Sequence, residues 1–546
     1  MFSKLFNKPA NCDVVVLGSG AAGLTAALLA HDSGASVQIV EKTARVGGTS
    51  AVSGAGIWIP NNHLMAEIGG QDSRDEALAY CRALTMERAA DELLTTFVDT
   101  APVMLKYLEA HTSLRFSAMS APDYYPETPG GKLKGRSVEP RLFDATALGA
   151  WRDKVRAPSM MTFCMTLEEI YHVYQAFYRP WAVPQDLLVD RMARGLASLG
   201  RALVCGLLHA VLERNSPVLL DSRAVELLHD DRRVAGVALR RAVDGETIRI
   251  HARKAVVLAT AGFEWNKDMQ AKFLPGWITH PNSPPFNEGD GLRMAMAVGA
   301  DLANMSESWN YPSIAIPGET YEGRPLARGI KAERSGPHII WVNAQGRRFV
   351  NEAANYNSVG KSFHEPKTNA PGYRNMPAWA ILDKQFRDRY VVGTATPDDP
   401  DPDWLIKADT LAGLAAKAGI DAQALEDTVA RWNQYVAQGR DPEFQRGDSA
   451  FDRYQGDHSA AHPNLGTIAV PPFYAMPVHP GALGTKGGVR TDAHARALDT
   501  DGRPIPGLYA AGNVAASITG PSYYGVGATL GPAMTWGYIA GRHAAQ

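Results

Sequence analysis

The feature that most constrains this fold is a glycine-rich turn near the N-terminus. The apolar run DVVVL, residues 13–17, is typical of a buried strand, and GSGAAG follows it directly. A small and apolar segment then extends to Gly34, and SVQIVEK (36–42) predicts a second buried strand. The spacing predicts one β-α-β unit whose glycine turn opens a helix, an arrangement that binds dinucleotides.

Each of the three glycines has a physical task in such a turn. Gly18 permits the tight turn, Gly20 lets the backbone approach a pyrophosphate, and Gly23 allows the helix to pack closely on the strand. The start of the helix offers free N–H groups and positive potential to the phosphates. Glu41, about twenty residues further on, is placed to accept a ribose hydroxyl.

Further glycine-rich loops favour FAD over a nicotinamide cofactor. GGTSAVSG (47–54) follows the second strand, and GLYAAGN (507–513) predicts another strand that ends in a glycine turn. A flavin has a long arm that must be threaded and packed, whereas a nicotinamide enzyme needs no second loop here. The loop at 47–54 has no histidine, so we expect FAD to be bound non-covalently. The expected cofactor-binding residues are Gly18, Gly20, Ala21, Ala22, Gly23, Glu41, Lys42, Gly48, Thr49, Ser50, Ser53, Gly54, Ala261, Gly262, Asp290, Gly512, Asn513, Thr529 and Leu530.

The bulk properties exclude several classes of protein. A formal net charge of -2 argues against a nucleic-acid partner, which needs a basic face. No apolar run reaches the roughly 18 residues of a membrane span, and the N-terminal residues lack the apolar core of a signal peptide. We expect a cytoplasmic protein without a metal site, because its cysteines are scattered without a ligand spacing; they are Cys12, Cys81, Cys164 and Cys205.

The chain is too long for one compact core. At 546 residues it should form two or more domains. Glycine turns become rare between about 306 and 478, where proline, asparagine and charged residues accumulate. We predict an α/β fold: a Rossmann-like FAD-binding domain (1–305 and 479–546) interrupted by an inserted α+β catalytic domain (306–478) that caps the substrate. The pattern from Asp186 to Glu213 predicts a helix packed on the core.

A second glycine-rich segment near the C-terminus is GPSYYGVGATLGPAM, residues 520–534. It places two phenols and bare backbone directly before a helix. Together with GSGAAG, GGTSAVSGAGIWIPNN, PDYYPETPGG, GDGLRMAMAVGADL, GRRFVNEAANY, GTKGGVRTD and GLYAAGN, it resembles the fumarate reductase/succinate dehydrogenase flavoprotein superfamily. Within that superfamily, the chain is similar over nearly its whole length to the 3-ketosteroid Δ1-dehydrogenases.

The resemblance implies 1,2-desaturation of a 3-ketosteroid, with a hydride passing from the β carbon to flavin N5. Carried over by motif, Tyr356 in NEAANY is the base that removes the α proton, and Tyr124 in PDYY supports it. Tyr523 and the backbone N–H of Gly527, in SYYGVG, hold the carbonyl oxygen. The electron acceptor stays open.

The chain departs from the family pattern at the tyrosine loop. The family motif is commonly TYPGxG, whereas SYYGVG has Tyr524 where the proline stands. Which phenol points at the ketone is therefore open, and PDYY leaves the same choice between Tyr124 and Tyr125.

The chemistry explains why these residue types occur together. A phenol and a backbone N–H aimed at an enolate-like oxygen form an oxyanion hole, and glycine exposes its N–H without a Cβ in the way. A tyrosine base has an ordinary pKa of about 10, so we expect a hydrogen bond from Tyr124 to lower the pKa of Tyr356. The helix start near Thr529 can stabilise negative charge on reduced flavin.

Two other reactions have to be weighed. A dicarboxylate enzyme of the fumarate reductase type places a proton-donating arginine shortly after the Asn-Glu of GRRFVNE, where this chain has Tyr356. The tyrosine loops also lack the cations that two carboxylates need. The same tyrosine mechanism on a smaller cyclic or terpenoid ketone is the stronger alternative, because the expected residues recognise the ketone ring and say little about further rings.

Overall fold

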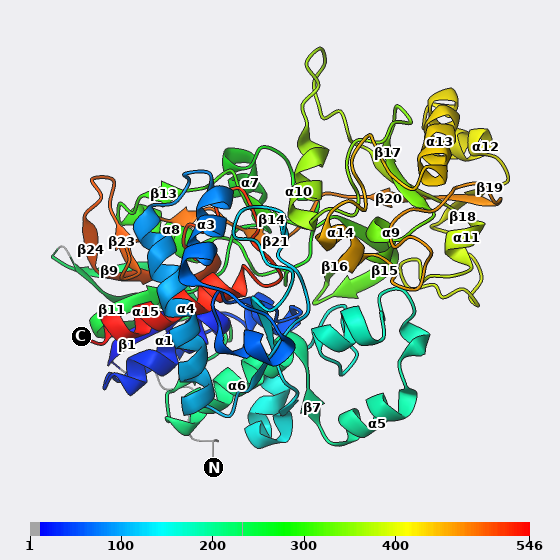
Figure 1. The fold of residues 1–546 in the computed structure, drawn as a ribbon. Helices are drawn as coiled ribbons and strands as arrows, with labels where there is room; N and C mark the ends of the chain where they lie inside the picture. Colours follow the sequence, from blue (N-terminus) through cyan, green and yellow to red (C-terminus); the bar gives the residue numbers. More distant parts are fainter. Residues whose placement is uncertain (1–10, 232) are drawn as a thin grey trace.

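Two sheets on opposite sides of the molecule organise the computed structural model (Figure 1). The structure describes residues 11–231 and 233–546. Residues 1–10, where the sequence predicts no signal peptide, lie outside the described residues.

The larger sheet contains the predicted β-α-β unit. Its strand order is β23-β24-β11-β1-β2-β8, and β10 and β9 extend it from β11. β1 pairs in parallel with β2, Val14 beside Val37, and with β11, Val14 beside Ala255. All of β2 is buried, as expected for a parallel strand that is covered on both faces. The strands are β1 (Cys12–Leu17), β2 (Val37–Val40), β8 (Val218–Leu219), β9 (Ser222–Asp230), β10 (Arg233–Arg241), β11 (Thr247–Leu258), β23 (Arg496–Leu498) and β24 (Pro504–Ala510).

Helices from the two ends of the chain pack together on this sheet. They are α1 (Ala21–Asp32) and α15 (Leu530–Ala544). Glycine permits their close approach, because a Cβ at Gly541 would lie 2.2 Å from the carbonyl oxygen of Ala26. The C-terminal part therefore returns to the sheet that the N-terminal part begins, through both α15 and β24.

The smaller sheet belongs to the middle of the chain. Its antiparallel order is β17-β18-β20-β19, with strands Ile339–Asn343, Ala378–Asp383, Phe473–Val478 and Ile406–Ala408 respectively. Ile340 and Val342 face helices α12 (Leu411–Ala418) and α13 (Ala422–Ala437), whereas Trp341 packs in a second cluster with Phe363.

An α/β fold of mixed sheets and helices agrees with the prediction; the boundaries at residues 306 and 478 stay predictions.

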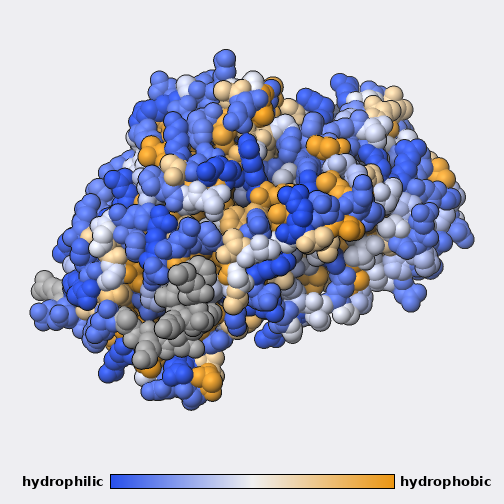
Figure 2. Space-filling view, turned by 90° about the horizontal axis from the view of Figure 1, so that it is seen from below, coloured by the Kyte–Doolittle hydropathy of each residue, from blue (hydrophilic) through white to orange (hydrophobic). Residues whose placement is uncertain are grey.

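The surface seen from below is mostly hydrophilic, and its apolar residues form small scattered groups (Figure 2). Among the described residues, no helix combines the length and the apolar character that crossing a membrane requires.

The helix predicted over Asp186–Glu213 is wrong as a single element. It divides into α5 (Gln185–Ala193) and α6 (Leu199–Glu213), joined by the short strand β7 (Leu196–Ala197). Gly195 and Leu199 have φ values of +71° and +54°, so the backbone leaves the helical region at this point. Only α6 is largely buried.

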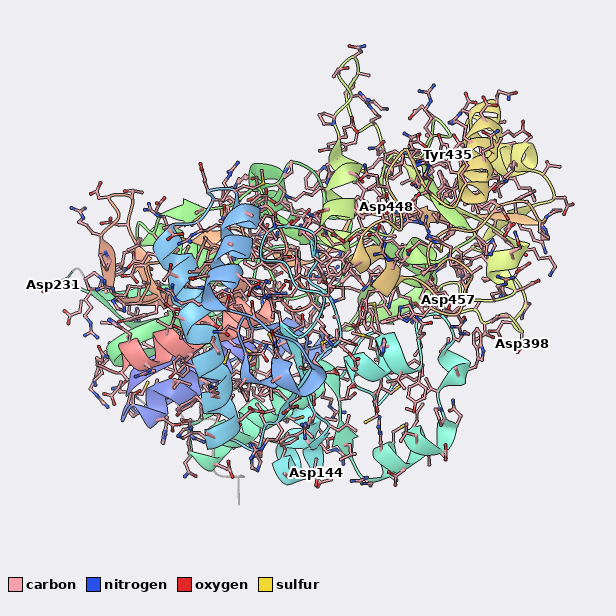
Figure 3. All side chains as sticks on the ribbon, viewed as in Figure 1. Asp144, Asp231, Asp398, Tyr435, Asp448 and Asp457 are labelled. Atoms are coloured by element: carbon pink, nitrogen blue, oxygen red, sulfur yellow. The ribbon has the colours of Figure 1, made fainter. Side chains whose placement is uncertain are left out.

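The segment before α5 is tied to the middle of the chain by Asp457, which Figure 3 labels. Its carboxylate accepts hydrogen bonds from the Arg179 guanidinium (2.9 Å) and from the Tyr390 hydroxyl (2.7 Å). Tyr178 also donates to the backbone oxygen of Gln455 (2.8 Å). These contacts hold residues 171–179 beside the smaller sheet.

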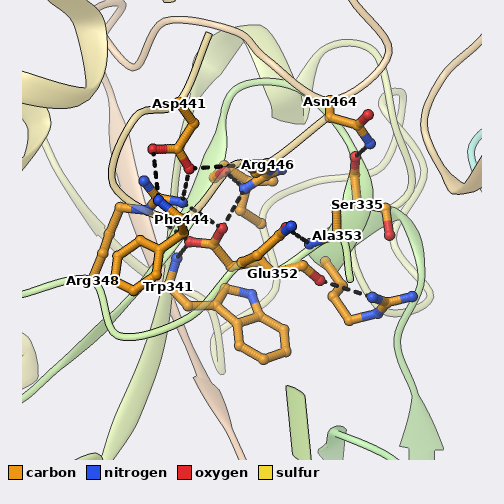
Figure 4. A network of polar contacts seen from close by, with 12 residues as sticks. Ser335, Trp341, Arg348, Glu352, Ala353, Asp441, Phe444, Arg446 and Asn464 are labelled. Atoms are coloured by element: carbon orange, nitrogen blue, oxygen red, sulfur yellow. Dashed lines mark hydrogen bonds and ion pairs between the residues drawn. The ribbon is translucent and has the colours of Figure 1, made fainter. Parts of the chain in front are cut away.

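A buried ionic network supports the segment that precedes Tyr356 (Figure 4). Glu352 accepts hydrogen bonds from Arg348 (2.9 Å), Arg446 (3.0 Å) and the backbone N–H of Trp341 (2.9 Å). Arg348 also donates to Asp441 at 2.9 Å. Because these charges are fully buried and paired, they fix the path of the chain between β17 and α10 (Tyr356–Lys361).

Candidate active site

A cavity of about 290 Å³ is lined by residues from both ends and from the middle of the chain. All four predicted catalytic residues line it, as do seventeen of the nineteen predicted cofactor-binding residues. The two that do not are Gly23 and Gly262. A Cβ at Gly23 would lie 2.1 Å from the oxygen of Gly18, and one at Gly262 would lie 2.2 Å from Thr485 Oγ1, so packing requires both glycines.

The turn before α1 has the form that a dinucleotide pyrophosphate requires. Gly18 has a φ of +106°, and a Cβ there would lie 2.3 Å from the oxygen of Ala259. Gly20 is the N-cap of α1 and offers no side-chain cap, and Gly20, Ala21 and Ala22 all line the cavity. Ala21 N–H donates to Ser50 Oγ at 3.0 Å, which joins this turn to the loop at 47–54. The donors and the bare backbone fit FAD.

Glu41 lies at the end of β2, as predicted. One of its carboxylate oxygens accepts from Ser19 Oγ (2.6 Å) and the other from Thr43 Oγ1 (3.0 Å). Ser19 Oγ in turn accepts the N–H of Gly47 (3.0 Å), so the carboxylate is oriented by both loops. The oxygen that accepts from Thr43 Oγ1 also accepts the N–H of Thr43 (3.0 Å), so the oxygen that accepts from Ser19 is the one that keeps a free acceptor site for a hydroxyl group.

Asp290 and Lys42 form an ion pair at the edge of the cavity, with Lys42 Nζ 3.0 Å from the Asp290 carboxylate. Arg223 also contacts that carboxylate, at 2.5 Å. Burial alone favours the neutral acid, but Lys42 and Arg223 hold the pKa of Asp290 below its usual value. The negative charge of Asp290 is therefore largely neutralised by Lys42 and Arg223.

Three phenols from distant parts of the sequence meet in the cavity. The ring centres of Tyr124 and Tyr356 are 5.4 Å apart, those of Tyr124 and Tyr523 5.1 Å, and those of Tyr356 and Tyr523 5.5 Å. Tyr311 packs on Tyr356 at 4.5 Å and also lines the cavity. Tyr356 is the first residue of α10, and Tyr523 lies in the loop before α15.

The acidity of Tyr356 differs from the expectation. Burial, followed by the neighbouring Tyr124 and Tyr523, raises the pKa of Tyr356 well above its usual value. The hydrogen bond between Tyr356 and Tyr124 lowers the pKa of Tyr124 instead, although burial dominates there as well. The expected lowering of the Tyr356 pKa is wrong for these side chains, because burial raises that pKa and the hydrogen bonds with Tyr124 and Tyr523 raise it further.

The structure separates the two pairs of adjacent tyrosines. Tyr125 is not among the residues that line the cavity and hydrogen-bonds to Ser358 at 2.6 Å, whereas Tyr124 lines the cavity. Tyr524 is buried and bonds to Thr85 Oγ1 (2.5 Å), and its backbone oxygen accepts from the Tyr80 hydroxyl (2.6 Å). Tyr524 in the position of the usual proline is thus anchored by α3 (Arg74–Thr85).

Gly527 exposes its N–H at the cavity wall. Its φ is +89°, and a Cβ would lie 2.1 Å from the carbonyl group of Gly56. Its oxygen accepts from the N–H groups of Trp58 (3.1 Å) and Gly531 (2.9 Å). No hydrogen bond between described residues uses the N–H of Gly527. The N–H is therefore free to bind an acceptor in the cavity.

Lys486 is a supporting residue that the sequence did not indicate. It is fully buried, and its ammonium donates to the oxygens of Ser522 (2.6 Å) and Gly520 (3.4 Å). It therefore holds the loop that presents Tyr523. A lysine within the apolar, glycine-rich run GALGTKGGV was the available signal, because lysine is rarely buried without a role.

Comparison with known proteins finds relatives that match nearly the whole chain. The family described as "FAD binding domain" matches residues 13–530. The chain is 39% identical over 97% of its length to a 3-oxosteroid 1-dehydrogenase of Mycolicibacterium smegmatis, and covers 96% of that protein. The chain belongs to the 3-ketosteroid Δ1-dehydrogenase family. It is an FAD-dependent oxidoreductase of the type that acts on CH–CH groups.

Two further proteins are similar to this chain. A solved 3-ketosteroid Δ1-dehydrogenase from Sterolibacterium denitrificans, in complex with 1,4-androstadiene-3,17-dione, is 40% identical with a TM-score of 0.92; the match covers 98% of this chain and 99% of the other. A 4-oxocyclohexanecarboxylate 2-dehydrogenase of Sinomonas cyclohexanicum is 43% identical over 97% of this chain and 92% of that protein.

Proposed function

We propose that the protein desaturates a 3-ketosteroid between the α and β carbons of its ketone ring (1,2-dehydrogenation). The observation that supports this most directly is the meeting of Tyr124, Tyr356, Tyr523 and Gly527 in one cavity with the predicted dinucleotide-binding residues. The steroid named for the Sterolibacterium complex and the 3-oxosteroid activity of the Mycolicibacterium relative support the substrate class.

In this mechanism the protein holds the ketone and moves one proton. Tyr523 Oη and the N–H of Gly527 donate to the ketone oxygen and stabilise the charge that develops there. Tyr356 Oη takes the α proton, and Tyr124 stabilises the resulting phenolate by hydrogen bonding. The electron pair of the α C–H bond becomes the new double bond as the β hydride leaves. FAD, when bound, supplies the hydride acceptor.

The residues around α1 would hold the cofactor. Gly20 and the start of α1 would contact the pyrophosphate, and Glu41 would accept a ribose hydroxyl. Bound this way, without a covalent link to the loop at 47–54, FAD should be released intact when the protein unfolds.

A smaller cyclic ketone is the second candidate substrate. The observation that favours it is the relative named for 4-oxocyclohexanecarboxylate, which is 43% identical to this chain. The proposed clamp contacts only the ketone oxygen and adjacent carbons, so the mechanism is the same for both substrates.

Anaerobic mixing of the yellow holoenzyme with three compounds tests the proposal. Androst-4-ene-3,17-dione should bleach the oxidised-flavin absorption band and yield a 1,4-diene. Bleaching by cyclohexanone alone would retain the tyrosine mechanism and replace the substrate class. Bleaching by succinate alone would overturn the proposal in favour of dicarboxylate chemistry.

A further inference from the structure

We propose that Asn287 is a further cofactor-binding residue, and that the buried carboxyl group of Glu264 holds its side-chain amide in position. Asn287 then presents a hydrogen-bond acceptor, and its neighbour Thr49 a donor, to polar groups of FAD. The inference rests on the dependence of the protein on FAD and holds for any ketone substrate.

Asn287 reaches the cavity from the segment before α8 (Asp290–Ala297). It lines the cavity and is 7% exposed. Its Nδ2 donates to Glu264 Oε1 at 2.6 Å and to Thr49 Oγ1 at 2.9 Å. Because an amide nitrogen has two hydrogens, these two bonds use its whole donor capacity and fix the plane of the amide.

The side-chain oxygen of Asn287 is left for a ligand. It forms no hydrogen bond with a described residue, and it is not among the side-chain oxygens that protein atoms fully enclose. An amide oxygen accepts N–H and O–H donors. FAD carries both kinds of donor, in its flavin ring and its hydroxyl groups, whereas androst-4-ene-3,17-dione carries neither. The cofactor is therefore the partner whose chemistry matches this oxygen.

Thr49 supplies the complementary donor. It lies in α2 (Gly48–Val52) and lines the cavity beside the glycine turn. Its oxygen accepts from Asn287, and no described residue accepts its O–H. A hydroxyl hydrogen can rotate toward an acceptor, so Thr49 is able to donate into the cavity. Thr49 and Asn287 thus form a donor and acceptor pair on one part of the cavity wall.

Glu264 supports this pair from behind the wall. It follows β11, is fully buried and is not among the residues that line the cavity. Its Oε1 accepts from Asn287 and from Ser283 Oγ (2.6 Å), whereas its Oε2 has no hydrogen-bond partner among the described residues. A buried carboxyl group without full compensation is costly, and its contact with a cavity amide points to a role in holding that amide.

The protonation state of Glu264 does not alter this role. Burial raises the pKa of Glu264, whereas the bonds from Ser283 and Asn287 lower it. A carboxyl oxygen can accept in both the ionised and the neutral form. Gly262 leaves room for the group, because a Cβ there would lie 2.8 Å from Glu264 Oε2. Gly262, which the sequence assigned to the cofactor site, therefore acts through packing on Glu264.

Release of FAD from the holoenzyme tests this inference without any ketone. Dissociation is followed as the rise in flavin fluorescence after dilution, with an FAD-binding apoprotein as a trap. The variants are Asn287→Leu, Glu264→Leu, Glu264→Gln and the double variant of the two leucine substitutions. Ser283→Ala is the matched control, because Ser283 donates to the same Oε1 but is not among the residues that line the cavity.

Asn287→Leu should accelerate FAD release by about 10-fold or more, and Glu264→Leu by about 3- to 10-fold. Glu264→Gln keeps an acceptor oxygen and should recover most of the slow release that Glu264→Leu loses. Ser283→Ala should stay within about twofold of the wild type. In the double variant, Glu264→Leu should add nothing to Asn287→Leu, because Glu264 acts through that amide.

Wild-type release from Asn287→Leu would remove Asn287 from the cofactor site and overturn the inference. Additive effects in the double variant, or equal effects of Ser283→Ala and Glu264→Leu, would show that Glu264 contributes general packing and not the position of the amide. These outcomes are independent of the desaturase proposal, which fails only if the ketones leave the flavin oxidised.

Discussion

The phenolic oxygen of Tyr523 lies 2.9 Å from the hydroxyl oxygen of Thr529, the N-cap residue of α15. This bond fixes the phenol that we assign to the ketone clamp relative to the helix start, and burial otherwise raises the pKa of Tyr523. A neutral, oriented O–H is the form that can donate to a developing oxyanion.

The Thr529→Val variant should lower kcat/KM about fivefold, because one hydrogen bond that orients Tyr523 is lost. The retained shape of valine should leave FAD bound. Thr535→Val is the matched control, since Thr535 lies on the same helix and, among the described residues, its hydroxyl bonds only to the oxygen of Gly531. An equal loss in both variants would show that helix packing, and not the phenol, is affected.

Flavin reduction should accelerate with pH. The pKa of Tyr356 is raised, so at pH 7 fewer than about one phenol in a thousand is ionised, and the reactive form grows about tenfold per pH unit. The rate should therefore rise from pH 7 to 10 without levelling off. Anaerobic stopped-flow measurements with α-deuterated ketone establish that proton removal is limiting. A rate independent of pH, with a full isotope effect, would contradict a tyrosine base.

Lys486→Met should lower kcat about tenfold with little change in FAD content. Methionine fills the volume but leaves the oxygen of Ser522 without its donor, so the loop that presents Tyr523 loses its anchor. Lys361→Met, a partly exposed lysine that pairs with Glu307, is the control. A change confined to KM would mean that Lys486 supports substrate binding and not the clamp.

Glu352→Gln should destabilise the protein by about 3–5 kcal/mol, because Arg446 would keep a buried charge without its carboxylate and Arg348 would keep only Asp441. Urea unfolding monitored by tryptophan fluorescence measures this change. Glu443→Gln is the comparison, since its carboxylate lies 3.9 Å from Arg348 and is partly exposed; a loss below 1 kcal/mol is expected there. Similar losses of unfolding free energy in both variants would show that Glu352 contributes no more to stability than a partly exposed carboxylate.

The sequence predicted the features that depend on local backbone form. GSGAAG between a strand and a helix specifies the turn around Gly18, and SYYGVG specifies the positive φ at Gly527, because glycine spacing encodes both. Features that depend on tertiary neighbours were missed. The contact of Lys486 with the oxygen of Ser522 joins segments that are far apart along the chain, and the break at Gly195 is hidden inside an apolar helical pattern. The raised pKa of Tyr356 likewise follows from burial, which no local pattern reports.

The most direct test of the account is the rate of anaerobic flavin reduction in the Tyr356→Phe variant. Phenylalanine keeps the ring contacts with Tyr311 and Tyr124 but removes the oxygen that takes the α proton. We predict a variant that retains FAD and is bleached by androst-4-ene-3,17-dione at least about 100-fold more slowly than the wild type. Bleaching at a near-normal rate would remove Tyr356 from the mechanism and contradict the central assignment.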